Sequence, residues 1–189
     1  MKTRSRKTQT ASRKKSPAKK ASETQNAENP LQELFLEELA DIYNAEQQLT
    51  KALPKMAKAA ESDELRQAFE QHLLETQEQI TRLDAAFESL GEPKKRKTCK
   101  GMQGLIEEGS EMMQEEKGSP SVDAALIASA QKVEHYEIAS YGTLCAWAEQ
   151  LGHDQALALL KENMAEEETT DQRLSALAES LANQKAELN

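Results

Sequence analysis

Four glutamates at a repeated spacing are the residues of this chain best suited to chemistry. Glu46 and Glu75 lie 29 residues apart, and Glu137 and Glu166 have the same separation. If each pair belongs to one helical hairpin, its two members stand equally far from the turn and therefore at the same height. Four carboxylates at one level suit a pair of iron or manganese ions, because a dry interior does not tolerate them unpaired. The spacing predicts a carboxylate-rich di-metal site.

Three further residues beside these glutamates are candidate ligands. His72 comes three residues before Glu75, so that both side chains can share a helix face. Glu134 comes three residues before Glu137, and Glu167 follows Glu166 directly. The complete set of predicted metal ligands is Glu46, His72, Glu75, Glu134, Glu137, Glu166 and Glu167.

The glutamate pairs belong to an internal repeat. Residues 34–90 match residues 125–181 at a constant shift of 91 without a gap. Apolar residues recur at helical spacing in both segments, and glycine and proline are scarce. The sequence therefore predicts an all-α fold: a ferritin-like four-helix bundle of two repeated helical hairpins, joined by a short crossover helix.

Capping and breaking residues give the expected helix boundaries. Asn29 and Pro30 are suited to begin the first helix, and Ser62 begins a second helix that stops at Gly91. The remaining predicted helices cover residues 103–116, 119–151 and 154–183.

Charge divides the chain into two parts. Residues 1–29 carry a net charge of +7 and contain no Leu, Ile, Val, Phe, Tyr or Trp, which predicts a disordered basic tail. Residues 30–189 carry a net charge of −16 and are expected to form the ferritin-like helical domain. The tail could associate with DNA nonspecifically by neutralising phosphates. Against this, the acidic domain would repel DNA, and no aromatic residue is interleaved with the basic run for stacking on bases.

Other features exclude several classes of protein. The sequence has no run of 18 apolar residues, so no membrane span is expected, and its N-terminus lacks the apolar stretch of a secretory signal. Cys99 and Cys145 have no metal-site spacing and imply no disulfide framework. We therefore expect a cytoplasmic protein.

Four segments resemble the YciF/YciE family of bacterial stress proteins, and the match extends over about residues 31–182. They are LADIYNAEQQL (39–49), HLLET (72–76), QKVEHYEIASYGTL (131–144) and EEETTDQRL (166–174).

The resemblance implies a ferritin-like five-helix fold related in shape to rubrerythrin, a di-metal site, expression under stress and, often, a homodimer. The chain departs from the wider ferritin-like pattern, in which Glu-x-x-His occurs on the second and fourth helices. Neither Glu75 nor Glu166 is followed by histidine three residues later, and Asn163 stands where the second repeat would match His72.

Two functions follow as alternatives. In the first, iron or manganese bound by the carboxylates supports oxidase or peroxidase-type chemistry or iron handling. In the second, the bundle is a metal-free structural or stress protein, whose inner carboxylates pair with Arg82, Arg173 or Lys132.

Overall fold

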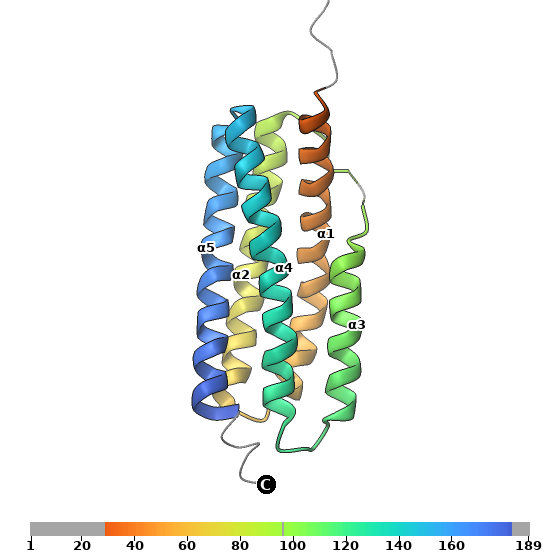
Figure 1. The fold of residues 1–189 in the computed structure, drawn as a ribbon, viewed down its shortest axis with the longest axis vertical. Coiled ribbons are helices and arrows are strands. Elements are labelled where there is room, and N and C mark those ends of the chain that lie inside the picture. Colours follow the sequence, from red (N-terminus) through yellow and green to blue (C-terminus); the bar gives the residue numbers. More distant parts are fainter. Residues whose placement is uncertain (1–28, 96, 183–189) are drawn as a thin grey trace, which may run out of the picture.

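The computed structural model describes residues 29–95 and 97–182, and these residues form an elongated helical bundle (Figure 1). The helices are α1 (Pro30–Ala59), α2 (Asp63–Leu90), α3 (Lys100–Glu115), α4 (Val122–Leu151) and α5 (Asp154–Leu177). A short π-helical segment, Ala178–Ala182, continues α5.

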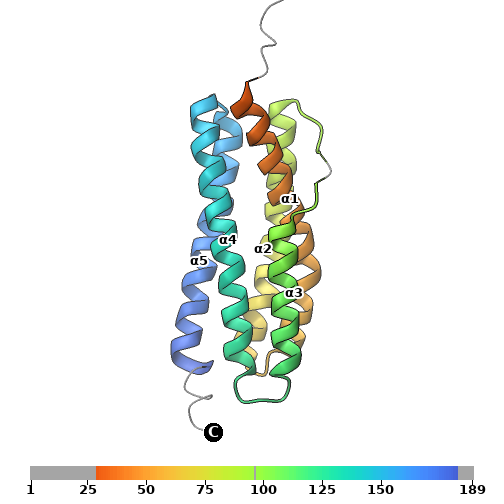
Figure 2. The same cartoon turned by 45° about the vertical axis from the view of Figure 1, so that its right-hand side comes forward.

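The four long helices form two antiparallel hairpins, α1–α2 and α4–α5, which lie side by side (Figures 1 and 2). Helix α1 packs on α2 and α4, and α5 packs on α4 and α2, so each long helix has two long neighbours. The shorter α3 connects the hairpins and lies on the outside, against α1 and α4. The predicted bundle of two hairpins with a crossover helix is confirmed.

The helix ends follow the capping chemistry expected from the sequence. The Asn29 side chain accepts a hydrogen bond from the Leu31 amide at 3.1 Å, and Ser62 Oγ accepts one from the Leu65 amide at 3.3 Å. Gly91 ends α2 with a φ of 68°, a conformation that glycine adopts without a steric cost.

The crossover helix begins earlier than predicted. It starts at Lys100 rather than near residue 103, because the Cys99 thiol caps it by accepting a hydrogen bond from the Met102 amide at 3.4 Å. Cysteine is not among the usual capping residues, so its presence did not signal a helix start. The last helix keeps α-helical geometry only to Leu177.

A buried aspartate fixes one hairpin against the other. Asp123, in the first turn of α4, accepts hydrogen bonds from the amides of Glu61 at 2.8 Å and Ser62 at 3.0 Å. These amides belong to the turn between α1 and α2, where helix geometry leaves N–H groups without partners. This contact sets the height at which α4 stands beside α1.

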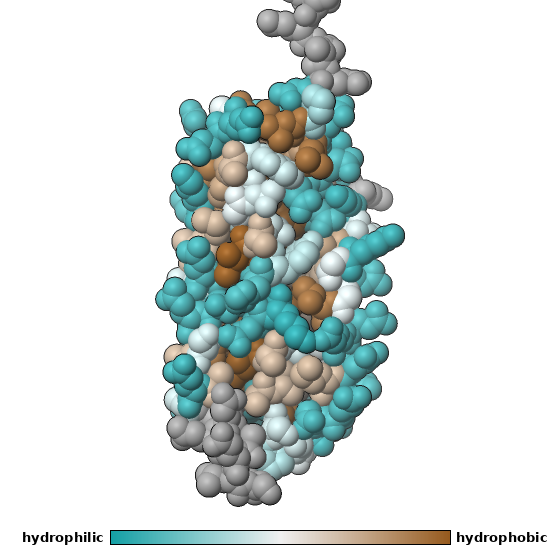
Figure 3. Space-filling model, in the orientation of Figure 1, coloured by the Kyte–Doolittle hydropathy of each residue, from teal (hydrophilic) through white to brown (hydrophobic). Residues whose placement is uncertain are grey.

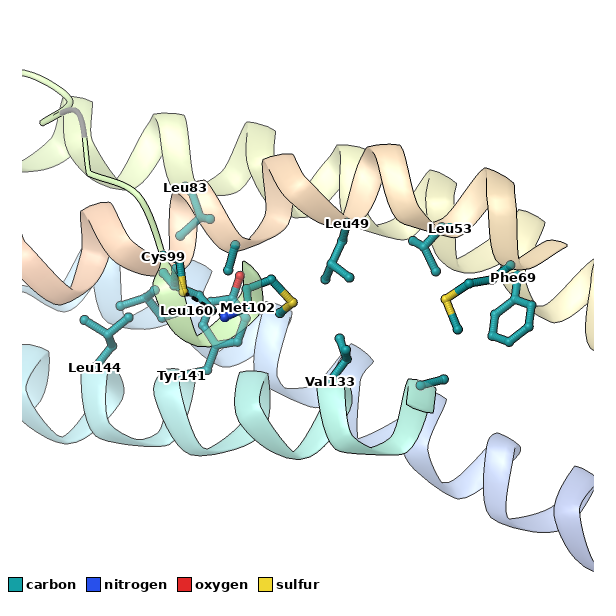
Figure 4. Close-up of a cluster of buried hydrophobic side chains, with 14 of the residues drawn as sticks. Leu49, Leu53, Phe69, Leu83, Cys99, Met102, Val133, Tyr141, Leu144 and Leu160 are labelled. Carbon is teal, nitrogen blue, oxygen red and sulfur yellow. Dashed lines mark hydrogen bonds between the residues drawn. The ribbon is translucent and has the colours of Figure 1, made fainter. Parts of the chain in front are cut away.

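Apolar side chains fill most of the interior. In Figure 4, Leu49 and Leu53 of α1 point toward Val133 of α4, and Tyr141 points inward from the same helix. The face drawn in Figure 3 is largely hydrophilic, with separate hydrophobic patches. No helix in the described part of the chain is both long and apolar enough to cross a lipid bilayer.

The predicted disordered tail lies outside the described residues, except for Asn29. DNA association through this tail, the homodimer and the cytoplasmic location remain predictions.

Two glycines of α3 provide a matched test of its packing. A Cβ atom on Gly101 would lie 2.8 Å from Cε2 of Tyr136, whose hydroxyl contacts Cys99 Sγ at 2.9 Å and donates to Asp41 Oδ2 at 2.9 Å. We expect Gly101→Ala to lower the free energy of unfolding by about 1–3 kcal/mol, because the Tyr136 ring must move.

Around Gly104 no atom lies within 4 Å of such a Cβ. Gly104→Ala should therefore raise stability by about 0.5–1 kcal/mol, the usual helix preference for alanine. Urea unfolding gives the free energy of unfolding of both variants. An equal change in the two would contradict the packing of Gly101 against Tyr136.

Candidate metal centre

The middle of the bundle contains a group of ionisable side chains in place of apolar ones. We define the interior cluster as Glu46, His72, Glu134, Glu137 and Glu167. Each of these side chains is buried, with at most 3% of the residue exposed. All four long helices contribute: α1 and α2 one residue each, α4 two and α5 one. A layer of this composition is unusual in a bundle core, where polar groups normally occur only with partners.

Four members of the interior cluster converge closely enough to share an ion. One ligand atom from each of His72, Glu134, Glu137 and Glu167 can be chosen such that all lie within 4.8 Å of one another. Nε2 of His72 is 3.3 Å from Oε1 of Glu134 and 3.9 Å from Oε2 of Glu167. Glu134 and Glu137 are three residues apart on α4 and therefore project from one face of it.

Most polar atoms of the interior cluster lack hydrogen-bond partners among the described residues. The cluster's buried atoms without a partner are both carboxylate oxygens of Glu137 and of Glu167, one oxygen each of Glu46 and Glu134, and both ring nitrogens of His72. Within the described chain, the ion pairs of the cluster carboxylates are to His72 alone, with no lysine or arginine. Buried carboxylates without partners are costly, so protons or metal cations must neutralise them.

The electrostatics of the interior cluster favour protonated carboxyls when no other cation is present. Burial raises the pKa of Glu46 to about 7, opposed by the hydrogen bond from Tyr141. Burial and the charge of Glu46 raise the pKa of Glu137 well above its usual value. Burial also raises the pKa of Glu167, although His72 opposes this. Burial alone would lower the pKa of His72, but the charge of the neighbouring Glu134 carboxylate raises it well above the usual value.

A hydrogen-bonded chain holds Glu46 in place and extends toward the surface. The Tyr141 hydroxyl donates to Oε1 of Glu46 at 2.5 Å, and Nδ2 of Asn163 donates to that hydroxyl at 3.0 Å. Arg82 Nε donates to Oδ1 of Asn163 at 2.5 Å, and the same guanidinium pairs with Glu166. Asn163 occupies the repeat position of His72, so this position orients Tyr141 rather than supplying a second histidine.

The structure brings five of the seven predicted ligands together. Glu75 and Glu166 are outside the interior cluster, with side chains 31% and 33% exposed. Oε2 of Glu75 lies 3.6 Å from Nδ1 of His72, whereas Glu166 pairs with Arg82. The expectation that the four repeated glutamates meet in one inner layer is thus corrected for Glu75 and Glu166.

Helical phase explains this correction. The buried positions of α5 are Ala156, Leu160, Asn163, Glu167 and Leu174. Their spacing defines the inward stripe of the helix. Glu166 is one residue away from this stripe, or about 100° around the helix, and Glu167 takes the inner position. The buried stripe of α2 likewise includes His72 and Thr76 but not Glu75 between them. The spacing of the inward-facing positions can be read from the sequence. The prediction followed the internal repeat instead, which pairs Glu75 with Glu166.

The fold and the interior cluster define a ferritin-like helical bundle with a buried carboxylate–histidine centre. The chain belongs to the family described as "Domain of unknown function (DUF892)", whose family model matches residues 30–187.

Named relatives agree with this assignment. Protein YciF of Escherichia coli (strain K12) is 51% identical over 158 residues, which cover 83% of this chain and 95% of that protein. The crystal structure of YciF, described as an E. coli stress protein, superposes with a TM-score of 0.79 over 82% of this chain and 98% of that one, at 49% identity. YcfI of Rhodopseudomonas palustris, described as a proposed structural protein, gives a TM-score of 0.76 at 46% identity, covering 80% and 96% of the two chains.

The pKa shifts predict how the stability of the metal-free protein depends on pH. Folded Glu46 holds its proton up to a pKa of about 7, whereas the ordinary value is 4.5, so the folded state binds more protons between these limits. The pKa values of Glu137, Glu167 and His72 are also raised in the folded state, so these groups change the pH dependence of stability in the same direction. The free energy of unfolding should therefore fall as pH rises from about 4.5 to 7, by about 1.4 kcal/mol per pH unit for each additional proton bound.

Urea unfolding in the presence of a chelator measures this slope. Glu137→Gln removes one of the titrating carboxyls and should flatten the slope, whereas Glu168→Gln, at an exposed position of α5, should leave it unchanged. A slope that both variants share with the unmodified protein would show that the interior cluster does not cause it.

Proposed function

We propose that the interior cluster binds a pair of divalent metal ions, iron or manganese, and that the protein uses them in handling peroxide, dioxygen or iron under stress. The observation that carries this proposal is the set of buried, unpartnered donor atoms on Glu46, His72, Glu134, Glu137 and Glu167. The donors come from four helices, and those of His72, Glu134, Glu137 and Glu167 converge at the centre of the bundle.

The chemistry of the donor set supports iron or manganese. Four carboxylates and one imidazole offer mainly oxygen ligands with one nitrogen, a combination suited to these metals rather than to thiolate-preferring ones. Glu134, Glu137 and Glu167 would share the ions with His72, and Glu46 would add an oxygen from α1. Binding would displace the protons that otherwise neutralise these carboxyls, so that affinity should rise with pH.

The other residues of the site would orient the donors and limit access by water. Tyr141 fixes one oxygen of Glu46 and leaves the other, which lacks a partner, free to bind an ion. Apolar side chains lie beside the cluster: Phe69 of α2 and Leu174 of α5 share a cavity wall with His72 and Glu134. A metal pair bound in such a site would supply redox chemistry toward peroxide or dioxygen. The description of the E. coli relative as a stress protein agrees with this role.

A metal-free structural bundle is the second candidate. The description of the R. palustris relative favours it, as does Asn163, which occupies the place of a second histidine and is engaged with Tyr141. In that case protons and His72 alone would neutralise the interior cluster.

Metal content separates the two candidates. Protein produced in medium supplemented with iron and manganese and purified without a chelator should hold about two metal ions per chain by elemental mass spectrometry. Glu137→Gln and Glu167→Gln each remove a buried charge while keeping the side-chain shape, and each should reduce the metal content by about tenfold or more.

Glu168→Gln is the matched control, since Glu168 is the exposed neighbour of Glu167 on α5. It should retain the full metal content. A metal content near zero in the unmodified protein, or one that both interior substitutions leave intact, would favour the metal-free bundle.

In the presence of a chelator, Glu137→Gln should also be more stable than the unmodified protein at about pH 7, because it no longer buries an unpartnered carboxyl.

A further inference from the structure

Two neighbouring cavities lie along the seam between α2 and α5, one toward the surface and one beside the interior cluster. The outer cavity has a volume of about 280 Å³ and includes Glu166 and Thr169 in its wall. The inner cavity is about 10 Å³, close to the space that one water molecule requires, and includes Phe69 in its wall. We call the two together the α2–α5 passage.

The two cavities share three wall residues, Glu75, Thr170 and Arg173, and we call this shared region the narrow part of the passage. At its inner end are His72 and Glu134, two members of the interior cluster. Both ring nitrogens of His72 are buried without a hydrogen-bond partner among the described residues, and so is one oxygen of Glu134. The passage therefore ends at donor atoms that remain available to a ligand.

Glu75 lines both cavities of the passage. Its side chain is partly exposed, and its Oε1 accepts a hydrogen bond from Nε2 of Gln71 at 3.0 Å. Its other oxygen lies 3.6 Å from Nδ1 of His72. Glu166 adds a second carboxylate at the outer cavity, where Arg82 holds it. Carboxylates that line a narrow opening attract cations and raise their local concentration.

The opposite side of the bundle has a different lining. There α3 covers the seam between α1 and α4, and the cavity beneath it is lined mainly by apolar side chains such as Leu49, Ile106 and Val133. A hydrated cation would have to lose its water against these side chains without a ligand in exchange.

We propose that divalent cations reach the interior cluster through the α2–α5 passage, and that Glu75 receives them from the outer cavity and transfers them to His72 and Glu134. This inference rests on the proposed metal-binding function. It also gives the partly exposed Glu75 and Glu166 a role, in uptake rather than in holding the ions. Arg173 lies near Glu75 at the narrow part, and its positive charge opposes the passage of a cation.

The rate of metal uptake tests the passage separately from the capacity of the site. Metal-free full-length protein is mixed rapidly with Co²⁺, the rise of the cobalt absorbance gives the rate, and elemental analysis gives the final content. Glu75→Gln should slow uptake by about tenfold, the lower range of electrostatic steering effects, with an unchanged final content. Thr170→Phe should slow it by obstructing the narrow part, and Arg173→Gln should accelerate it.

Two matched controls use exposed positions away from the passage. Glu78→Gln makes the same change one helical turn further along α2, and Thr143→Phe makes the same change on α4. Both should take up Co²⁺ at the rate of the unmodified protein.

The outcomes distinguish the two proposals. Uptake rates of Glu75→Gln and Thr170→Phe within about twofold of the unmodified protein would overturn the passage while leaving the metal site intact. A reduced final content in Glu75→Gln would overturn the transfer role, because Glu75 would then be a ligand. If the unmodified protein takes up no Co²⁺, both the proposed function and the passage are contradicted.

Discussion

The burial of four carboxylates around one histidine is the constraint on which the rest of this structure depends. Moving an ionised carboxylate out of water costs several kcal/mol even after the protein relaxes, and His72 can balance only one of the four charges. The remaining charge must be neutralised by protons or by metal ions. Because both would occupy the same oxygens, metal binding at the interior cluster would be coupled to folding and to pH. A bundle with leucines at these positions would have none of these couplings.

The architecture fixes the donors before any ion arrives. Each hairpin brings one member of the cluster from each of its two helices, and α4 adds a second, so no single helix determines the site. Asp123 sets the height of α4 against the α1–α2 turn, and Tyr141 orients Glu46 from across the bundle. The crossover helix α3 covers one side of the bundle with apolar residues, whereas polar residues line the seam between α2 and α5. The two sides of the bundle therefore differ in the chemistry that they present to the interior cluster.

The sequence predicted the fold more completely than the site. Helical periodicity, Asn29, Ser62 and Gly91 mark helices whose caps form as expected, because these signals are local. The repeat correctly singled out Glu46 and Glu137 for the interior, but Glu75 and Glu166 lie one residue out of phase with the buried stripes of α2 and α5. Which residue of a Glu-Glu pair faces inward depends on how each helix is rotated against its neighbours, and this is a property of tertiary packing. The cap of α3 by Cys99 depends similarly on contacts with Asn44 and Tyr136 that are distant in sequence.

The most direct test of a metal-binding interior cluster is anomalous X-ray diffraction from crystals of protein purified without a chelator, with data collected at the iron and manganese absorption edges. The account predicts strong anomalous density at the centre of the bundle, within about 2–2.5 Å of oxygens of Glu137 and Glu167 and of a nitrogen of His72. Anomalous density found only at the surface, or a well-ordered cluster with none, would contradict it.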